Sequence, residues 1–263
     1  MRSIRTLRTH LAAGEFEPYD YERKFRKMYE NNILLKGKID RIDLCRTDDE
    51  IMVKIIDYKT GSRDFDITGL YYGLSLQLAV YMKQVLLSLE AEKAPLKITP
   101  AAMLFYRIQD PQIREKKMLT EQEMQDAILG VLNTKGVVCS RAGIVDKLDT
   151  SFSGQSLVIP VKKNEKNEEI KETEHVMQSN AFQTVLDYSE KKAVGLAKEI
   201  MKGEITCTPV NASKQDACEY CPYKTSCGFD ERIPGYRKEY KPDVTLAELC
   251  EERSKEDESE IHT

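Results

Sequence analysis

The sequence predicts an α/β fold in which a short mixed β-sheet is flanked by helices and followed by a cysteine-rich segment. Two β-rich runs, ILLKGKIDRIDLC and EIMVKIIDYKTG, are joined by the polar residues RTDDE and therefore predict a hairpin. A long stretch with helical spacing comes next, and a compact apolar run, AAMLFYRI, follows it. Strands that alternate with helices in this way are typical of a layered α/β core.

The N-terminal region is expected to begin with a short helix at 4–13. Residues 16–29 mix aromatic and charged side chains, and the first clear strand signal comes only at about Ile33. The two hairpin strands follow from there, and the pair Gly61 and Ser62 ends the second.

A helix is predicted at about 69–90 because apolar residues recur there at steps of four, three and four, the spacing of one helical face. These residues are Leu74, Leu78, Tyr81 and Val85. Pro95 and Pro100 indicate a loop, and the apolar run 101–108 suits a buried strand.

The second half of the chain is expected to be mainly helical. Thr120 and Glu123 match a capping box, which predicts a helix at 120–132. Residues 151–175 combine a short apolar run with many charges, which favours a hairpin or a mobile loop over core. A last long helix is expected at about 178–202. We therefore expect a core domain at 1–204, a cysteine-rich segment at 205–230 and a tail at 231–263.

The charge of the chain is unevenly distributed. Of the formal net charge of −4, residues 245–263 contribute seven acidic and two basic side chains, so the rest is close to neutral. Residues 1–41 hold ten Lys or Arg against six Asp or Glu, which permits a local phosphate-binding patch as well as ordinary solvated surface. No window is apolar enough for a membrane span or a signal peptide, so a cytoplasmic protein is expected.

Three residues of the hairpin carry the strongest chemical signal. Alternation on a strand places Asp57 and Lys59 on one face, and Asp40 lies 17 residues upstream on the partner strand, within reach across the ladder. Two carboxylates are hard ligands for Mg²⁺ or Mn²⁺, and a nearby ammonium can orient water or stabilise charge on a phosphate. The trio therefore suits phosphodiester hydrolysis. The simpler alternative is a surface ion pair of Asp40 with Arg41 or Lys59.

The order and spacing of four motifs resemble a known family. GKIDRID, IIDYKTG, YYGLSLQLAVY and CEYCPYKTSCGFD, which together span about residues 37–230, are similar to AddB and RecB-type nuclease domains of the PD-(D/E)XK superfamily. The resemblance implies a restriction-endonuclease-like core and a metal-dependent DNA exonuclease acting on single strands. It also implies a helicase partner in double-strand break repair. No ATP-binding P-loop sequence is present, so any motor would lie in another subunit or domain.

The resemblance also implies roles for individual residues. Asp40 and Asp57 would bind the metal, with the backbone carbonyl of Tyr58 as a third ligand, and Lys59 would be the catalytic lysine. Gln77 and Tyr81 match a Q-x-x-x-Y helix that shapes the active site and contacts DNA, although Tyr81 also fits a core aromatic. Family members carry an upstream His or Glu ligand, for which the candidates are His10 and Glu22.

Seven cysteines divide into a cluster and isolated residues. Cys218, Cys221 and Cys227 form C-x2-C-x5-C, a trio of soft ligands suited to iron–sulfur or zinc. The resemblance implies a [4Fe–4S] cluster whose fourth cysteine lies upstream of GKID. Its ligand set is incomplete in this chain, so we expect a fragment or a shortened relative, with Cys207 as the nearest substitute. Cys45, Cys139 and Cys250 are expected to be structural or incidental.

Two other functions remain open on this evidence. One is a catalytically inactive DNA-binding or scaffolding module that keeps the fold and the cysteine staple, which the missing upstream ligand motivates. The other is a CRISPR-associated or phage exonuclease of the same superfamily.

Overall fold

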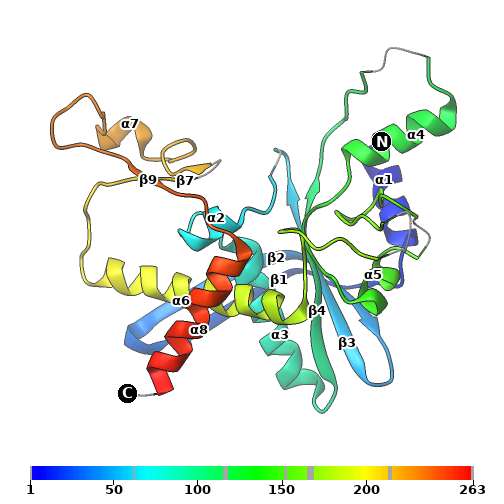
Figure 1. The fold of residues 1–263 in the computed structure, drawn as a ribbon, viewed down its shortest axis with the longest axis horizontal. Helices are drawn as coiled ribbons and strands as arrows, with labels where there is room; N and C mark the ends of the chain where they lie inside the picture. The colour runs from blue at the N-terminus through cyan, green and yellow to red at the C-terminus, as the bar shows by residue number, and fades with distance from the viewer. Residues whose placement is uncertain are drawn as a thin grey trace. The chain divides into compact units, whose positions relative to one another are not determined.

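A computed structural model describes residues 2–61, 63–114, 118–150, 153–164, 169–212 and 215–261. The elements run in the order α1 (Arg2–Ala12), β1 (Glu17–Tyr29), η1 (Glu30–Asn32), β2 (Ile33–Arg46), β3 (Glu50–Lys59), α2 (Ile67–Tyr71), α3 (Gln77–Lys93), β4 (Lys97–Arg107), α4 (Glu121–Val131), β5 (Lys135–Cys139), α5 (Ala142–Leu148), β6 (Val176–Met177), α6 (Ser179–Met201), β7 (Val210–Ala212), β8 (Gln215–Asp216), α7 (Lys224–Cys227), β9 (Glu239–Lys241) and α8 (Leu246–Ile261) (Figure 1). The predicted α/β class is confirmed.

The main sheet has six strands in the order β1-β2-β3-β4-β5-β6. It is mixed: β2 and β3 form the predicted antiparallel hairpin, β3 pairs parallel with β4, and β4 pairs antiparallel with β5. The parallel pair needs a crossover connection, which α2 and α3 supply. All seven residues of 51–57 in β3 are buried, because this central strand is covered on both faces.

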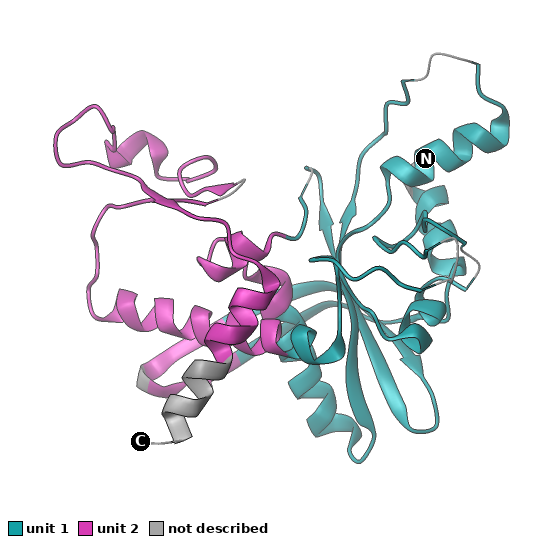
Figure 2. Cartoon of the chain, in the orientation of Figure 1, with its two compact units in different colours: residues 1–26, 36–65, 81–183 teal, residues 27–35, 66–80, 184–263 magenta. Residues whose placement is uncertain are grey.

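The chain divides into two compact units that interleave along the sequence (Figure 2). Unit 1 consists of residues 1–26, 36–65 and 81–183 and holds most of the main sheet. Unit 2 consists of residues 27–35, 66–80 and 184–263 and holds most of α6, α8 and a small sheet of order β8-β7-β9. The expected boundaries after residues 204 and 230 stay a prediction. No described helix has both the length and the apolar character that crossing a membrane requires.

The strand β1 was not predicted from the sequence. Its residues alternate only between exposed and partly exposed positions, so it lacks the apolar face that makes a strand recognisable. It lies at the end of the strand order, next to β2. An edge strand rich in charged residues is well suited to that position, because charges discourage pairing with another chain.

The predicted helix at 69–90 was wrong in one respect, because it is two helices. The first, α2, ends after Tyr71, and Gly73 adopts a left-handed φ of +87°. Its amide donates to Leu70 O, and the amide of Leu74 donates to Gly69 O, so the backbone turns out of the helix in a glycine-ended cap. The second helix, α3, begins at Gln77, so Leu74 of the predicted face lies before it, whereas Leu78 and Val85 are buried in the helix as predicted.

Two further predictions need correction. Pro100 lies inside β4 instead of a loop, at the point where the register with β3 shifts between Val53 and Lys54. Such an irregularity tolerates proline because a ladder hydrogen bond is already lost there. The described part of 151–175 also contributes to the core: Val158, Ile159 and Val161 are buried. Its isolated bridges, Gln155 with Lys162 and Lys163 with Ile170, resemble the expected hairpin, whereas residues 151, 152 and 165–168 lie outside the described residues.

The remaining helix predictions are confirmed with small shifts in their ends. Helix α4 has Thr120 as its N-cap, and both hydrogen bonds of the capping box with Glu123 are present. Helix α6 covers the predicted 178–202 almost completely. Local signals were sufficient in these segments because capping and periodicity agree with the tertiary packing.

Candidate active site and cysteine segment

The hairpin brings the two predicted carboxylates together. Residue Arg41 of β2 lies opposite Ile56 of β3, and extending this antiparallel register by one residue places Asp40 opposite Asp57. A carboxylate oxygen of Asp40 accepts a hydrogen bond of 2.9 Å from the backbone amide of Tyr58. Asp40 is therefore fixed beside the strand that carries the other two site residues.

Lys59 and Asp57 form an ion pair on the same face of β3. Asp57 is 3% exposed, whereas Lys59 is partly exposed. Arg41 is not the ion-pair partner of Asp40, because the two residues are neighbours on β2 and point to opposite faces of the sheet. Lys59 pairs with Asp57, Asp40 bonds the Tyr58 amide, and Arg41 binds Asp43.

The electrostatics of the two carboxylates, Asp40 and Asp57, suit the binding of a cation. Burial raises the pKa of the Asp57 carboxyl, and the negative charge of Asp40 raises it further, although the hydrogen bond and charge of Lys59 act in the opposite direction. The net pKa of Asp57 is raised mainly because burial disfavours its charged form, and the nearby Asp40 carboxylate adds repulsion. A divalent cation between them would relieve that repulsion.

A row of basic residues continues from this site across the sheet. Lys59 pairs in register with Arg107 of β4, Asp57 pairs with Phe105, and Phe105 pairs with Lys135 of β5, so all five share one face. The Lys59 ammonium lies 5.8 Å from the centre of the Phe105 ring. The Nε atom of Arg107 is buried and has no hydrogen-bond partner among the described residues. The face of the sheet that carries Asp57 therefore also carries the cationic side chains of Lys59, Arg107 and Lys135.

The opposite face of the same strands carries a buried charged cluster. Arg41 donates two hydrogen bonds of 2.6 Å to Asp43, and Lys54 lies 3.0 Å from the same carboxylate. All three side chains are less than 10% exposed. Because Arg41 and Lys54 both bind the same Asp43 carboxylate, the cluster links the two hairpin strands on the face away from Asp57 and contributes no group to the Asp57 face.

The structure places His10 away from the proposed metal ligands. Its ring packs edge-on against Tyr106 at 5.4 Å, and the cations Lys54 and Arg41 act on it electrostatically. Tyr106 and Lys54 point to the face opposite Asp57, since Tyr106 pairs with Tyr58, one position from Asp57, and Lys54 is three positions from it. The candidate role of His10 as upstream ligand is therefore not supported.

The other upstream candidate, Glu22, lies on the β1 side of the site. It accepts a hydrogen bond of 2.5 Å from Lys38, which lies two residues before Asp40. This hydrogen bond raises the pKa of Lys38, and the charge of Asp40 contributes a little to the rise. Glu22 itself adopts a left-handed φ of +54°, a conformation that few non-glycine residues adopt. It is strongly exposed and paired, so it is near the acidic site without completing it.

Gln77 and Tyr81 begin α3 one turn apart. Gln77 is the exposed first residue of the helix and belongs to unit 2. Tyr81 belongs to unit 1, where its ring packs edge-on against Phe25 at 5.6 Å. A Cβ atom added to Gly37 would lie 2.8 Å from the Tyr81 ring, so that glycine leaves room for it. Tyr81 thus has a packing role, and the DNA-contact roles of both residues stay predictions.

The four clustered cysteines occupy one short region of unit 2. Cys207 and Cys227 have sulfur atoms 3.8 Å apart, and the pKa of the Cys207 thiol is raised first by Cys227 and also by Cys218 and Cys221. Yet no three His, Cys, Asp or Glu side chains in the described part of the chain are close enough to hold a metal ion. The thiols are neighbours that would have to move inward to share one.

Sequence reasoning missed the basic row and the buried cluster. The cluster had a sequence signal, because Arg41, Asp43 and Lys54 are charged residues at alternate positions in otherwise apolar strands. The row had none, since it depends on the pairing of β4 with β3 and β5.

The chain is similar to a family of known proteins. The family profile described as the PD-(D/E)XK nuclease superfamily matches residues 1–228. Proteins named as one subunit of an ATP-dependent helicase/deoxyribonuclease are 31% identical in Caldanaerobacter subterraneus subsp. tengcongensis, 32% in Clostridium tetani and 33% in Lachnoclostridium phytofermentans. These matches cover 99%, 97% and 98% of this chain, and each covers 23% of the relative. The chain thus spans about a quarter of the length of these relatives.

Proposed function

Because the chain belongs to the PD-(D/E)XK nuclease superfamily, we propose that it is a metal-dependent deoxyribonuclease domain that acts as an exonuclease on single-stranded DNA. The observation that carries this proposal is the gathering of Asp40, Asp57 and Lys59 on one hairpin: Asp40 accepts a hydrogen bond from the Tyr58 amide, and Lys59 pairs with Asp57. The alternation and pairing of the strands make this arrangement a property of the fold.

The donor set of this site fits a hard divalent cation. Carboxylate oxygens of Asp40 and Asp57, with the carbonyl of Tyr58, would hold Mg²⁺ or Mn²⁺, which prefer oxygen ligands. When bound, such an ion supplies Lewis-acid polarisation of a phosphate oxygen and activation of water. Iron and zinc would favour the soft thiols of unit 2 instead.

The residues of the chain have separate tasks in this proposal. Asp40 is held by the Tyr58 amide, which keeps its carboxylate in place before substrate arrives. Lys59 carries a flexible ammonium that can turn from Asp57 to a phosphate or an attacking water. Arg107 and Lys135 continue the positive charge along the same face, where neighbouring phosphates of the DNA strand would bind.

We further propose that the domain works with a helicase, as part of a helicase–nuclease that processes DNA ends in double-strand break repair. The relatives support this, because their names combine an ATP-dependent helicase with a deoxyribonuclease and they contain this domain as about a quarter of their length. Those names also favour this role over a CRISPR-associated or phage exonuclease.

The cysteine segment is proposed to bind a [4Fe–4S] cluster as a structural staple. Thiolates are the usual ligands of such clusters, and Cys218, Cys221 and Cys227 supply three. Cys207 is the described thiol best placed to be the fourth, since its sulfur lies 3.8 Å from that of Cys227. The cluster would hold the segment together and take no part in hydrolysis.

A nuclease assay with end-labelled linear single strands, circular single strands and duplex DNA tests the activity. We expect degradation of linear single strands with Mg²⁺ or Mn²⁺ and none with EDTA. Lys59→Ala should lower the rate about 10²–10³-fold, the cost of removing one group that stabilises transition-state charge. Asp57→Ala should abolish it.

Asp48→Ala is the matched control, because Asp48 is an exposed carboxylate in the turn at the other end of the same hairpin. It should cleave like the unmodified chain. Cleavage in EDTA, or full activity in both Asp57→Ala and Lys59→Ala, would contradict the proposal. Salt-dependent DNA binding without cleavage under any metal would instead favour the inactive DNA-binding module.

A further inference from the structure

The connection between the site strand and α3 is held by the C-terminal part of unit 2. This connection, residues 66–76, includes α2 and leads from the Lys59 strand to Gln77. The Thr68 hydroxyl donates to the carbonyl of Val244 at 3.2 Å and accepts from its amide at 2.9 Å. The Tyr188 hydroxyl donates to the carbonyl of Tyr71 at 2.9 Å. The connection therefore depends on segments far away in the sequence.

Gln215 of β8 makes the densest of these contacts. Its Nε2 atom donates to Asp66 at 3.0 Å and to the Ser75 hydroxyl at 2.7 Å, while its Oε1 atom accepts from the same hydroxyl at 2.9 Å. Asp66 is also the N-cap of α2, where its other oxygen accepts from the Thr68 amide. One side chain thus bonds both ends of the connection.

Gly69 leaves the space in which Gln215 lies. A Cβ atom added at this glycine would be 2.4 Å from Gln215 Nε2 and 2.7 Å from its Cδ, closer than real contacts allow. The φ of Gly69 does not lie in the left-handed region, so the backbone does not require glycine there. The absence of a side chain has a packing reason, which is to admit the amide of Gln215.

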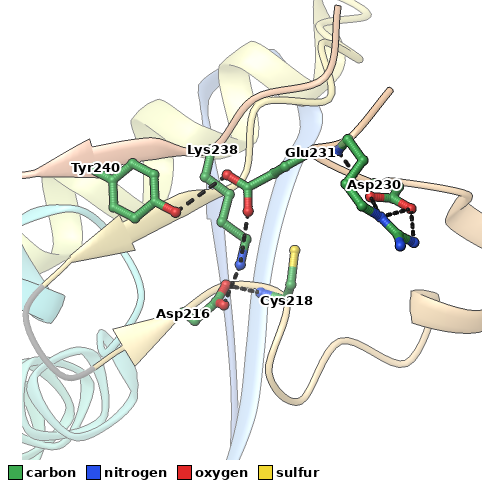
Figure 3. Close-up of polar contacts among 7 residues, drawn as sticks. Asp216, Cys218, Asp230, Glu231, Lys238 and Tyr240 are labelled. Carbon is green, nitrogen blue, oxygen red and sulfur yellow. Dashed lines mark hydrogen bonds and ion pairs between the residues drawn. The ribbon is translucent and has the colours of Figure 1, made fainter. Parts of the chain in front are cut away.

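The residue after Gln215 links it to the cysteines (Figure 3). Asp216 accepts a hydrogen bond of 2.8 Å from the backbone amide of Cys218 and forms an ion pair of 2.6 Å with Lys238. These contacts lower the pKa of the Asp216 carboxyl, with Lys238 the largest contribution. The two residues of β8 therefore point in opposite directions. Asp216 points toward the cysteine loop, and Gln215 points toward the connection.

We propose that Gln215 is a positioning residue that couples the folded state of the cysteine segment, residues 207–227, to the connection that carries Gln77 and the rest of α3. When the segment is ordered, β8 presents the Gln215 amide, and Asp66 and Ser75 are held. When the segment loosens, these bonds are lost and the connection loses its order. The effect of this coupling on catalysis rests on the proposed nuclease function. The structural coupling itself does not.

Hydrogen exchange of the full chain, read at residues 66–76, tests the coupling directly. Gln215→Ala should speed exchange there about tenfold, because the hydrogen bonds of its amide with Asp66 and Ser75 are lost. The double change Cys218→Ala and Cys221→Ala should speed exchange at residues 66–76 when Gln215 is present. It should add nothing further in the Gln215→Ala background. Arg232→Ala is the control, because Arg232 is an exposed residue near the cysteines that bonds only Asp230 among the described residues. It should leave exchange unchanged.

Gly69→Ala separates a specific contact from general damage. In the unmodified chain its methyl group should displace Gln215 and speed exchange. In the Gln215→Ala background only Asp66 Oδ2, at 2.9 Å from the added Cβ, stays close, so the effect should be clearly smaller. In the nuclease assay Gln215→Ala should lower kcat about tenfold with an unchanged KM for DNA. Equal effects of Gly69→Ala in both backgrounds, or undisturbed exchange in Gln215→Ala, would overturn the coupling. A chain that never cleaves DNA but shows the exchange pattern would overturn only the proposed function.

Discussion

His10 is a buried imidazole whose neighbours include two cations. Burial lowers its pKa from 6.5 to about 4, and the charges of Lys54 and Arg41 add to the shift. Asp43 also belongs to this cluster, but both of its oxygens are bonded to the two cations. Burial therefore favours the neutral form of His10 in the folded chain at pH values well above 4.

We predict that His10 makes the chain sensitive to acid. The unfolded imidazole takes up a proton near pH 6.5 and the folded one only near pH 4, so stability is full above pH 6.5 and falls as the pH drops. Between pH 8 and pH 5 the loss from this group is about 2 kcal/mol. Urea unfolding at the two pH values should show it, and His10→Phe should lack it. If His175→Gln, at a partly exposed histidine, removed the same dependence, the assignment would be wrong.

Single residues were predictable from the sequence only where strand alternation decides their position. The shared face of Asp57 and Lys59 follows from their spacing of two, and the position of Asp40 from the short hairpin. The position of His10 does not follow, because the face of the sheet that α1 covers is decided by packing between distant segments. Glu22 is a similar case, since its strand has no apolar pattern to read.

At the scale of elements, close pairing of the central strands leaves no room for a side chain at the glycine of β5. Gly136 of β5 has φ of +129°, and a Cβ atom there would lie 2.2 Å from the carbonyl oxygen of Met103 on β4. The backbone of β4 cannot move away, because it pairs on its other side with β3. Gly143 in α5 is the opposite case, with no atom within 4 Å of an added Cβ.

Two alanine substitutions should therefore have opposite signs. Gly136→Ala should destabilise the chain by about 3 kcal/mol or more, through overpacking and a strained backbone. Gly143→Ala should stabilise it by about 0.5–1 kcal/mol, the usual gain in a helix. Thermal or urea unfolding measures both. Equal effects of the two changes would mean that the close pairing of β4 and β5 is not as described.

The basic row across three strands should appear in the salt dependence of DNA binding. Each phosphate contact adds about 0.7 to the slope of log K against log salt for a single strand. The double variant Arg107→Ala and Lys135→Ala should thus lower that slope by about 1.4. Lys97→Ala is the matched control, at the other end of β4, about 33 Å away. Fluorescence anisotropy with EDTA present measures binding apart from cleavage. An unchanged slope in the double variant would remove the row from the DNA-binding surface.

Elements were predictable where a local signal agreed with the packing. The hairpin, the capped helix α4 and the long helix α6 carried such signals in turn residues, a capping box and periodicity. The break between α2 and α3 depended on Gly73, which a periodic apolar face concealed. The small strands β7, β8 and β9 are two or three residues long, too short for any period to show.

At the scale of the whole molecule, the two units differ in what stabilises the fold of each. Unit 1 contains the continuous buried residues 51–57 and a full hydrophobic core. Between residues 205 and 241, Ala212 is the only buried residue among those described. A region with so little buried apolar surface needs another source of stability, and metal ligation by its thiols is the one that its sequence offers. The tail of unit 2 adds acidic charge, which cannot replace a core.

We therefore predict that metal stabilises the cysteine segment and leaves the sheet unaffected. Anaerobically purified chain should contain iron, and chelation should expose residues 205–230 to protease while 51–57 stay protected, because binding free energy at such a site is folding free energy. Cys207→Ala should lower the metal content if this thiol completes the ligand set, whereas Cys45→Ala, at a buried cysteine of β2, should not. Elemental analysis and limited proteolysis with mass spectrometry measure both effects. A segment that resists protease equally with and without metal would show that its stability comes from elsewhere.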